Sequence, residues 1–316
     1  MLSVKQIRCH GSGNRFLLFD AVAEPRLEAL ALHPRLIERL CSEPRRMDGV
    51  LLTVCVGEEY GMRMFNTDGS EAEMCGNGIR CVARQAQHYV GDTVSDFTLW
   101  SGGHSHLIRH EAPIFGSIPT YRVEIAIRTA TADFPSSLEG GAWIGRPIPD
   151  LDEALRFTYL NLGNPHLVAE VDAIDLEKLT ALGERVKQLT ELLPKGVNVS
   201  LFRHTADQTI YTATYERGVG LTSSCGTAMT ACSTAACLLG LCRTEQPIRV
   251  LNSGGMVRCE CRRKGGEITT SLSGNATFEA EGRLMLDLEN EAFTLLDEHP
   301  LSEEIEAYET FLKTIR

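Results

Sequence analysis

The sequence predicts an α+β fold of two pseudo-symmetric domains, each a mixed or antiparallel sheet wrapped around a central helix. Two segments carry this prediction, Met74-Cys75-Gly76-Asn77-Gly78 and Ser224-Cys225-Gly226-Thr227-Ala228. Each follows a β-type run that ends in a polar residue, Asn66 in one copy and Glu216 in the other, at the same separation from the cysteine. Each precedes a helical pattern and then a Leu-X-Ser-Gly-Gly run. We interpret this as one structural unit used twice.

Composition limits the class of protein. The chain has 316 residues, enough for two domains, and its 43% apolar and 23% charged residues are ordinary for a soluble globular protein. A formal net charge of −11 argues against nucleic acid as a partner. We expect no signal peptide and no membrane span, because no apolar run approaches the roughly 20 residues that a span needs. Eleven cysteines, not spaced as a secreted framework, favour free thiols in the cytoplasm.

In the first half we expect strands over residues 4–10, 16–20, 50–56 and 60–66 and a helix over 27–40. After Cys75, apolar residues recur at helical spacing, and Gly91 is a suitable stop. We predict that the two Cys-Gly segments are the N-termini of the central helices.

In the second half, small residues over 228–239 predict a helix buried on most sides. We also expect a strand over 121–127, a loop over 134–150, and helices over 170–192 and 301–316. The predicted domains are residues 1–122, completed by about 278–316, and residues 123–277.

A cysteine at a helix N-terminus meets unpaired backbone N–H groups and the positive end of the helix dipole. This lowers the pKa of a thiol, and the same N–H groups bind carboxylates. Two such sites facing each other could remove a proton from one side of an α-carbon and return one to the other. We therefore expect Cys75 and Cys225 to form an acid/base pair in a cleft between the domains. This design needs no pyridoxal phosphate and no other cofactor.

Further polar residues suit an amino-acid ligand. Asparagines stand in turn-rich settings at Asn14, Asn66, Asn164 and Asn198. Glu216 and Arg217 are adjacent and could hold an ammonium and a carboxylate, since arginine binds carboxylates in a bidentate manner. The asparagines could instead be turn formers with positive φ, and Glu216-Arg217 could be a surface pair.

The chain resembles the diaminopimelate epimerase family. The matching segments occur in the family's order over residues 5–280: His10-Gly11-Ser12-Gly13-Asn14-Arg15-Phe16, Phe65-Asn66-Thr67-Asp68-Gly69-Ser70-Glu71, Met74-Cys75-Gly76-Asn77-Gly78-Ile79-Arg80-Cys81, Gly163-Asn164-Pro165-His166, Gly196-Val197-Asn198, Tyr215-Glu216-Arg217-Gly218 and Ser224-Cys225-Gly226-Thr227. The resemblance implies a homodimer that acts, without a cofactor, on a small amino-acid substrate.

The resemblance also implies roles for individual residues. Cys75 and Cys225 would be the catalytic pair, with His166 and Glu216 supporting the thiols. The reacting carboxylate would be bound by Gly76, Asn77, Gly226 and Thr227. The distal end of the substrate would be held by Asn66, Asn164, Asn198 and Arg217, with Glu216 on an ammonium group. Asn14 belongs to the first of the matching segments and joins the substrate-binding set.

Three features depart from the family pattern. Arg15 follows Asn14 where the family commonly has aspartate, and Gly49 follows Asp48 where a ligand-contacting glutamine is common. The chain also continues over 289–316, beyond the usual end.

Other interpretations compete with a two-thiol epimerase. A zinc site could use cysteines with His104, His106 and His110, but paired Cys-X-X-Cys motifs are missing, so we expect no metal and place these histidines in a solvated loop. The rival functions are a cofactor-independent racemase of another amino acid, a non-catalytic amino-acid-binding protein, and a redox switch in which Cys75 and Cys225 form a disulfide.

Overall fold

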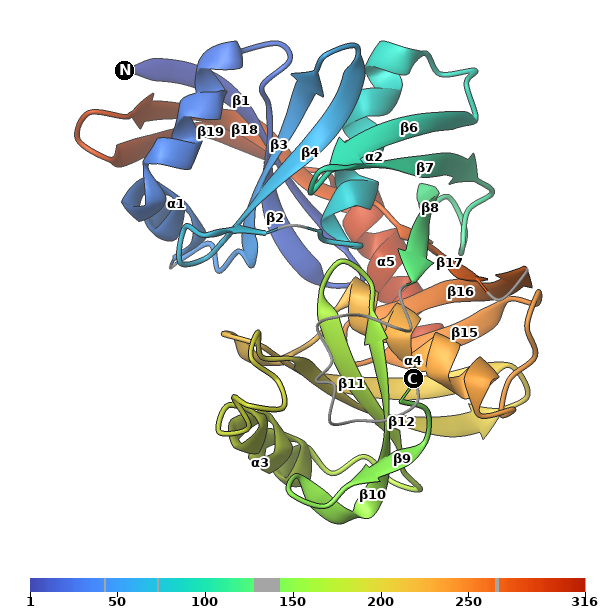
Figure 1. The fold of residues 1–316 in the computed structure, drawn as a ribbon. Coiled ribbons are helices and arrows are strands. Elements are labelled where there is room, and N and C mark those ends of the chain that lie inside the picture. Colours follow the sequence, from blue (N-terminus) through green and yellow to red (C-terminus); the bar gives the residue numbers. More distant parts are fainter. Residues whose placement is uncertain (43, 73, 128–142, 265–266, 316) are drawn as a thin grey trace. The chain divides into compact units, whose positions relative to one another are not determined.

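The structure is a computed structural model, which describes residues 1–316 except 43, 73, 128–142, 265–266 and 316. The chain divides into two compact units (Figure 1). Unit 1 comprises Met1–Val123 and Ser273–Arg316, and unit 2 comprises Glu124–Leu272. The chain leaves unit 1 within strand β8 (Thr120–Ile127) and re-enters it within β17 (Glu267–Asn275). Unit 1 therefore contains both ends of the chain.

Unit 1 contains a curved mixed sheet. Besides β8 and β17, its strands are β1 (Leu2–Gly11), β2 (Asn14–Asp20), β3 (Gly49–Val56), β4 (Glu59–Asn66), β5 (Glu71–Ala72), β6 (Asp96–Ser101), β7 (His104–Glu111), β18 (Thr277–Asp287) and β19 (Ala292–Pro300). Strand β1 is antiparallel to both β2 and β18, and β2 is parallel to β3. Strand β4 is antiparallel to β3 and β5 and parallel to β6.

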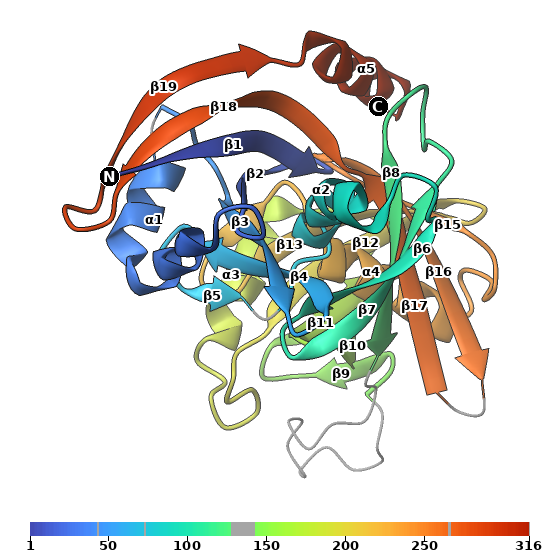
Figure 2. The same ribbon diagram turned by 90° about the horizontal axis from the view of Figure 1, so that it is seen from above.

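Helix α2 (Gly78–Val90) is the central helix of unit 1. It packs against β1, β2, β3, β4 and β6, which surround it (Figure 2). Its buried residues include Ile79, Val82 and Ala86, whose spacing predicts an amphipathic helix. It ends at Gly91, whose φ of 104° is strained for any residue with a side chain.

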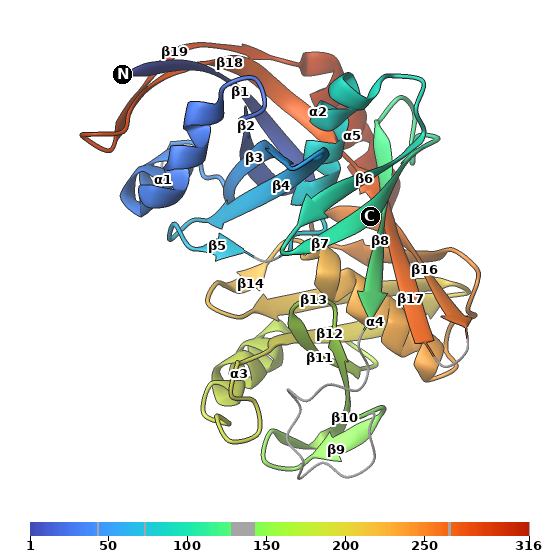
Figure 3. The ribbon, with the colours of Figure 1, turned by 45° about the horizontal axis from the view of Figure 1, so that its top comes forward.

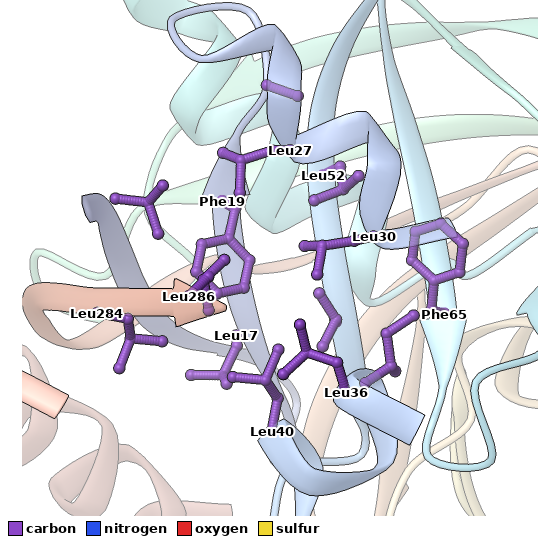
Figure 4. Packing of buried hydrophobic residues seen from close by; sticks show 14 of the residues in the cluster. Leu17, Phe19, Leu27, Leu30, Leu36, Leu40, Leu52, Phe65, Leu284 and Leu286 are labelled. Carbon is purple, nitrogen blue, oxygen red and sulfur yellow. The ribbon is translucent and has the colours of Figure 1, made fainter. Parts of the chain in front are cut away.

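The other face of this sheet packs against the 3₁₀ helix η1 (Pro25–Leu32) and helix α1 (Pro34–Cys41). Leu17 and Phe19 of β2 meet Leu30 there, within one apolar cluster (Figure 4). Side chains alternate along a strand, so the equally buried Phe16 and Leu18 point to the face that carries α2. Burial on both faces explains why β2 is an unbroken apolar run rather than an alternating one.

The C-terminal segment completes unit 1. Strand β18 lies beside β1 although the two are far apart in the sequence, and β19 extends the sheet beyond β18 (Figure 2). Helix α5 (Ser302–Ile315) follows, as expected from the pattern over 301–316, and buries Tyr308 and Phe311. The ring of Tyr308 makes an edge contact with the ring of His10, with centroids 4.4 Å apart. This segment is therefore part of the core around β1.

Unit 2 repeats this plan. Its strands, besides the parts of β8 and β17, are β9 (Arg146–Ile148), β10 (Asp152–Asn161), β11 (Pro165–Glu170), β12 (Asn198–Ala206), β13 (Thr209–Glu216), β14 (Gly220–Thr222), β15 (Ile248–Asn252) and β16 (Gly255–Lys264). The central helix α4 (Gly226–Leu238) packs against β10, β11, β12, β13, β15 and β16. All its residues over 226–236 are buried, as its small side chains predict. Helix α3 (Leu176–Val186) packs on β12 and β13 through a separate apolar cluster (Figure 3).

The central strand pairings of the two units correspond. Strands β2 and β3 are parallel, as are β11 and β12; β3 and β4 are antiparallel, as are β12 and β13. Strand β4 pairs with β5 and, in parallel, with β6; β13 pairs in the same way with β14 and β15. The central helix follows β5 in one unit and β14 in the other. The predicted fold class, two α+β halves each with a sheet around a central helix, is confirmed.

Several local expectations were wrong. The helix expected over 27–40 is two pieces, because Pro34 cannot donate the backbone hydrogen bond that would continue η1 into α1. The helix expected over 170–192 is limited to α3, which Asp175 caps through Glu177 N and Lys178 N.

Two expected loops contain strands. The three histidines of the expected solvated loop are in strand β7. Residues 134–142 of the loop expected over 134–150 lie outside the described residues, and 146–148 form β9. In the part of the chain that the structure describes, no helix is long and apolar enough to cross a membrane.

Candidate active site

Cys75 lies directly before the N-terminus of α2 and is half-buried. Asn77 occupies the N-cap position without a side-chain capping hydrogen bond, and the helix begins at Gly78, whose backbone N–H donates to Cys75 Sγ at 3.2 Å. A Cβ at Gly78 would come within 2.8 Å of Leu51 Cδ2, so glycine allows the helix to begin close to β3. The predicted placement of this Cys-Gly segment at a helix N-terminus is confirmed.

The fully buried Arg80 lies beneath this segment. Its Nη1 donates to Gly76 O at 2.7 Å, and its Nη2 donates to Asn77 Oδ1 at 3.1 Å. With the Asn77 amide held in this orientation, Asn77 Nδ2 donates to Asn14 Oδ1 at 3.3 Å. Asn14 Oδ1 is 4.0 Å from Cys75 Sγ. The structure thus brings together Cys75, Gly76, Asn77 and Asn14.

A buried network holds the turn that precedes Asn14. Asn275 Oδ1 accepts from Ser12 N at 2.7 Å, and Asn275 Nδ2 donates to His10 O at 3.1 Å. Arg80 also donates to Asn275 O and to Ser12 Oγ, at 3.1 Å and 3.3 Å. Arg80, Ser12 and Asn275 were not among the site residues predicted from the sequence. The available signal was a charged residue in the first turn of the helix, two residues after the Cys-Gly-Asn-Gly segment.

Asn66 lies at the end of β4. Its Nδ2 donates to Ser70 Oγ at 3.0 Å, and its backbone pairs with Gly49 of β3. A Cβ at Gly49 would lie 2.5 Å from Phe65 O, so the two strands approach too closely for a side chain. The close spacing of β3 and β4 at this position therefore excludes a side chain such as glutamine.

Cys225 is the N-cap of α4 and is 8% exposed. Its Sγ is 3.5 Å from Thr227 Oγ1, and Thr222 Oγ1 donates to Glu216 Oε1 at 2.5 Å. Burial, and next the Glu216 carboxylate, raise the pKa of Cys225 well above that of an ordinary thiol. The expectation that its helix N-terminus lowers this pKa was wrong: Thr227 and the Ala228 backbone N–H act in that direction but are outweighed.

A chain of polar contacts leads from Thr227 into the core of unit 2. Asn164 Nδ2 donates to Thr227 Oγ1 at 3.3 Å, and Asn164 Oδ1 is 2.9 Å from His166 Nε2. His166 is fully buried, and its Nδ1 has no hydrogen-bond partner among the described residues. Burial, and next Arg217, lower the pKa of His166 to about 3, so the imidazole is neutral at pH 7. With Asn164 Oδ1 accepting from Nε2–H, the free nitrogen Nδ1 is an acceptor.

Asn198 and Arg217 are a second polar pair in unit 2. The buried Asn198 accepts from the backbone N–H of Arg217 at 2.9 Å. The exposed Arg217 side chain donates from Nη1 to Lys195 O and passes over Gly196, where a Cβ would lie 2.8 Å from Arg217 Cδ.

None of the four predicted asparagines has a positive φ, so the alternative that they serve as left-handed turn formers was wrong.

Cys225 also lines a cavity of about 420 Å³ within unit 2. Its wall contains several hydroxyl side chains, which include Thr222, Ser223 and Ser224. All eleven cysteines are among the described residues, and none of them forms a disulfide. Across the described residues, no group of three or more His, Cys, Asp or Glu side chains is arranged to hold a metal ion.

Two buried histidines make stability depend on pH. Burial is the main cause that lowers the pKa of both His10 and His166 from 6.5 to about 3. The unfolded chain therefore binds more protons than the folded chain between pH 6.5 and about 3, and the free energy of unfolding falls as the pH falls through this range. We expect each histidine to remove about 3 kcal/mol of stability at pH 4, as an upper value. Urea denaturation at pH 7 and pH 4 measures this loss, and His166→Gln should make it smaller; an equal loss in this variant would contradict the assignment.

A model of the family described as diaminopimelate epimerase matches residues 7–108 and 158–279. The chain belongs to the diaminopimelate epimerase family. The diaminopimelate epimerase of Clostridium acetobutylicum is 33% identical over 326 residues, an alignment that covers 100% of this chain and 96% of the relative. The segment over 289–316 is thus within the length shared with this relative. By its family the protein is an isomerase, an epimerase of amino acids.

Solved structures agree on the fold. The Bacillus anthracis phenazine biosynthesis protein of the PhzF family has a TM-score of 0.65 at 14% identity, covering 90% of this chain and 100% of that chain. A hydroxyproline epimerase from Agrobacterium vitis, solved with bound trans-4-hydroxy-L-proline, has a TM-score of 0.64 at 13% identity, covering 90% and 92%. At these identities the likeness establishes the fold alone.

Proposed function

We propose that the protein interconverts LL- and meso-2,6-diaminopimelate without a cofactor, in the synthesis of lysine and peptidoglycan precursors. The observation that carries this proposal is the pair of cysteines at equivalent places, each at the N-terminus of a central helix. The relative named diaminopimelate epimerase, at 33% identity over the whole chain, supports the choice of substrate.

In the proposed reaction Cys75 and Cys225 act on opposite faces of one α-carbon. The thiolate of one cysteine takes the α-proton and becomes a thiol, and the bonding electrons remain on the substrate as a carbanion. The thiol of the other cysteine then donates its proton to the opposite face and becomes a thiolate. The product is the epimer, and the protonation states of the two cysteines are exchanged.

The carbanion needs stabilisation at the adjoining carboxylate, because an α-proton of an amino acid is weakly acidic. The first N–H groups of a helix have no partner within the helix, and they point at a ligand placed on the helix axis. We propose that Gly76 and Asn77 of one unit and Gly226 and Thr227 of the other donate to this carboxylate. Fixed donors of this kind stabilise charge that develops in the transition state.

The distal amino-acid group is assigned to the remaining polar residues. Arg217 would bind its carboxylate, and Glu216 its ammonium group, with Asn66, Asn164 and Asn198 completing the contacts. Glu216 would also accept from the Cys225 thiol, next to which it lies. The neutral His166, with a free acceptor nitrogen, would support proton transfer at a thiol.

Deuterium exchange tests the proposal. Incubated in D₂O with LL-diaminopimelate and no cofactor, the protein should form the meso isomer and place deuterium at the inverted α-carbon, as measured by NMR. A panel of other L-amino acids identifies a racemase with a different substrate. Tight binding of diaminopimelate without exchange would overturn the catalytic proposal in favour of a binding protein.

We further propose a cytoplasmic homodimer. Free cysteines throughout the chain suit a reducing compartment. Light scattering coupled to size-exclusion chromatography gives the mass directly: a value near 34.8 kDa, the mass of one chain, would contradict the dimer.

A further inference from the structure

Helix α4 and strand β16 of unit 2 meet along a row of hydroxyl and thiol side chains. The helix packs against this strand (Figure 1). Thr230, Thr234 and Cys237 share one face of α4, because residues four and seven positions apart lie on the same side of a helix. Thr230 Oγ1 is 4.0 Å from Cys259 Sγ, so this face is turned to β16. Cys261 is two residues further along β16 and therefore points the same way as Cys259.

The row ends in a contact between two thiols. The side chains of Cys237, in the last turn of α4, and Cys261 are hydrogen-bonded to each other. The segment that follows the helix contacts both residues. Cys237 Sγ is 3.7 Å from Arg243 O, and Glu245 N donates to Cys261 O at 2.8 Å. Two elements and the segment between them thus hold the two sulfur atoms together.

Exposure distinguishes this pair from a similar one in unit 1. There, Cys9 of β1 and Cys81 of α2 are also hydrogen-bonded through their side chains. Both Cys9 and Cys81 are fully buried, whereas Cys237 is half-buried. A dissolved oxidant therefore reaches the pair in unit 2 first.

The surroundings of Cys261 favour its thiolate. The hydrogen bond from Cys237 is the main cause that lowers the pKa of Cys261, and it outweighs burial; Arg263 and Thr234 act in the same direction. The thiolate, rather than the thiol, is the form that reacts with peroxides, and a second thiol in contact can complete a disulfide.

We propose that Cys237 and Cys261 form a redox-active dithiol, which hydrogen peroxide oxidises to a disulfide and which a small thiol reduces again. The site is at the opposite end of α4 from Cys225, and the inference does not depend on the proposed function.

The oxidation has two steps. The Cys261 thiolate attacks one oxygen of the peroxide, the O–O bond breaks, and the departing hydroxide takes up a proton to become water. Cys261 is then a sulfenic acid. The Cys237 sulfur loses its proton and attacks the Cys261 sulfur, the S–S bond forms, and the sulfenic oxygen leaves as the second water. Two electrons have passed from the two sulfur atoms to the peroxide.

The disulfide has a measurable consequence for stability. It ties the last turn of α4 to β16 and closes the chain over residues 237–261. Such a cross-link removes conformations from the unfolded chain. We expect the melting temperature of the oxidised protein to lie about 3–10 °C above that of the reduced protein.

Peptide mapping identifies the bond. The whole protein is reduced, freed of reductant, treated with hydrogen peroxide, unfolded in urea with N-ethylmaleimide, and digested without reductant. Mass spectrometry with fragmentation should find Cys237 linked to Cys261, and dithiothreitol added before the block should remove the link. Cys9 and Cys81 should carry N-ethylmaleimide. Links confined to other cysteines, or a Cys9–Cys81 link that forms as fast, would overturn the proposal.

Variants separate the partner from its neighbours, because Cys242 and Cys259 are also near Cys237. Cys237→Ser and Cys261→Ser should each abolish the link and the rise in melting temperature. Cys242→Ser and Cys259→Ser are the matched controls and should keep both. Cys237 is half-buried, so its serine variant gives a result even if Cys261→Ser does not fold. A rise in melting temperature on oxidation that persists in Cys237→Ser would overturn the assignment.

Discussion

Replacement of either Cys75 or Cys225 by alanine is expected to lower the rate of epimerisation of diaminopimelate by about 10²–10⁴-fold. Each thiol serves one face of the α-carbon, so inversion requires both. Cys75 is half-buried, and Cys225 lines a cavity, so loss of a sulfur atom should leave the fold intact. The rate at which meso-diaminopimelate forms is measured either with a coupled assay that consumes this isomer or by chiral chromatography.

A single-thiol variant should retain one half of the chemistry. The remaining thiolate can take a proton from its own face and, after exchange with solvent, return deuterium to that face. Cys75→Ala and Cys225→Ala should therefore each exchange deuterium into one stereoisomer without inversion, and the two variants should select opposite stereoisomers. Cys55→Ala, which removes an exposed thiol, is the matched control and should behave as wild type. Full epimerisation by both active-site variants would disprove the two-thiol mechanism.

Arg217→Met should reduce kcat/KM for LL-diaminopimelate by about 10²-fold or more, because a carboxylate taken from water would lose its charged partner. Asn198 fixes the backbone of Arg217 at 2.9 Å, while the exposed side chain is available to a ligand. Arg217→Lys keeps the charge but not the bidentate geometry, so an intermediate loss is expected. Steady-state kinetics gives these ratios.

L-Lysine serves as the control substrate for Arg217. It has the same α-amino-acid group and a distal ammonium, but no distal carboxylate. Arg217→Met should therefore leave the already slow deuterium exchange at the α-carbon of lysine almost unchanged. The ratio of the rate with diaminopimelate to the rate with lysine should fall. An equal loss with both substrates would place Arg217 at the reacting carboxylate, or would assign it a structural role, instead of at the distal end.

Local sequence patterns were sufficient to locate the central helices. The start of α2 depends on the Cys-Gly-Asn-Gly segment and the spacing of Ile79, Val82 and Ala86, all of which lie within residues 75–86. The same holds for α4, whose small residues predict burial. These interactions involve residues that are close together in the chain, so the sequence alone is enough to predict them.

Contacts between distant segments were not predictable in this way. Arg80 resembles a surface residue on a helix, yet it is fully buried because Asn275 and Ser12 accept from it. The pKa of Cys225 was expected to be lowered by its helix N-terminus, and the structure reverses the direction through burial and Glu216. In each case the deciding partner comes from another element, and its position depends on tertiary packing.

The division of the chain has a consequence for biosynthesis. Unit 1 is assembled from Met1–Val123 and Ser273–Arg316, and β1 cannot form its pairing with β18 until the whole of unit 2 has been synthesised. Unit 2 is one continuous stretch and has all its residues available earlier. Although its sequence is translated after most of unit 1, we expect unit 2 to be the first to reach its native structure, with the Cys75 half maturing only after β18 has been synthesised.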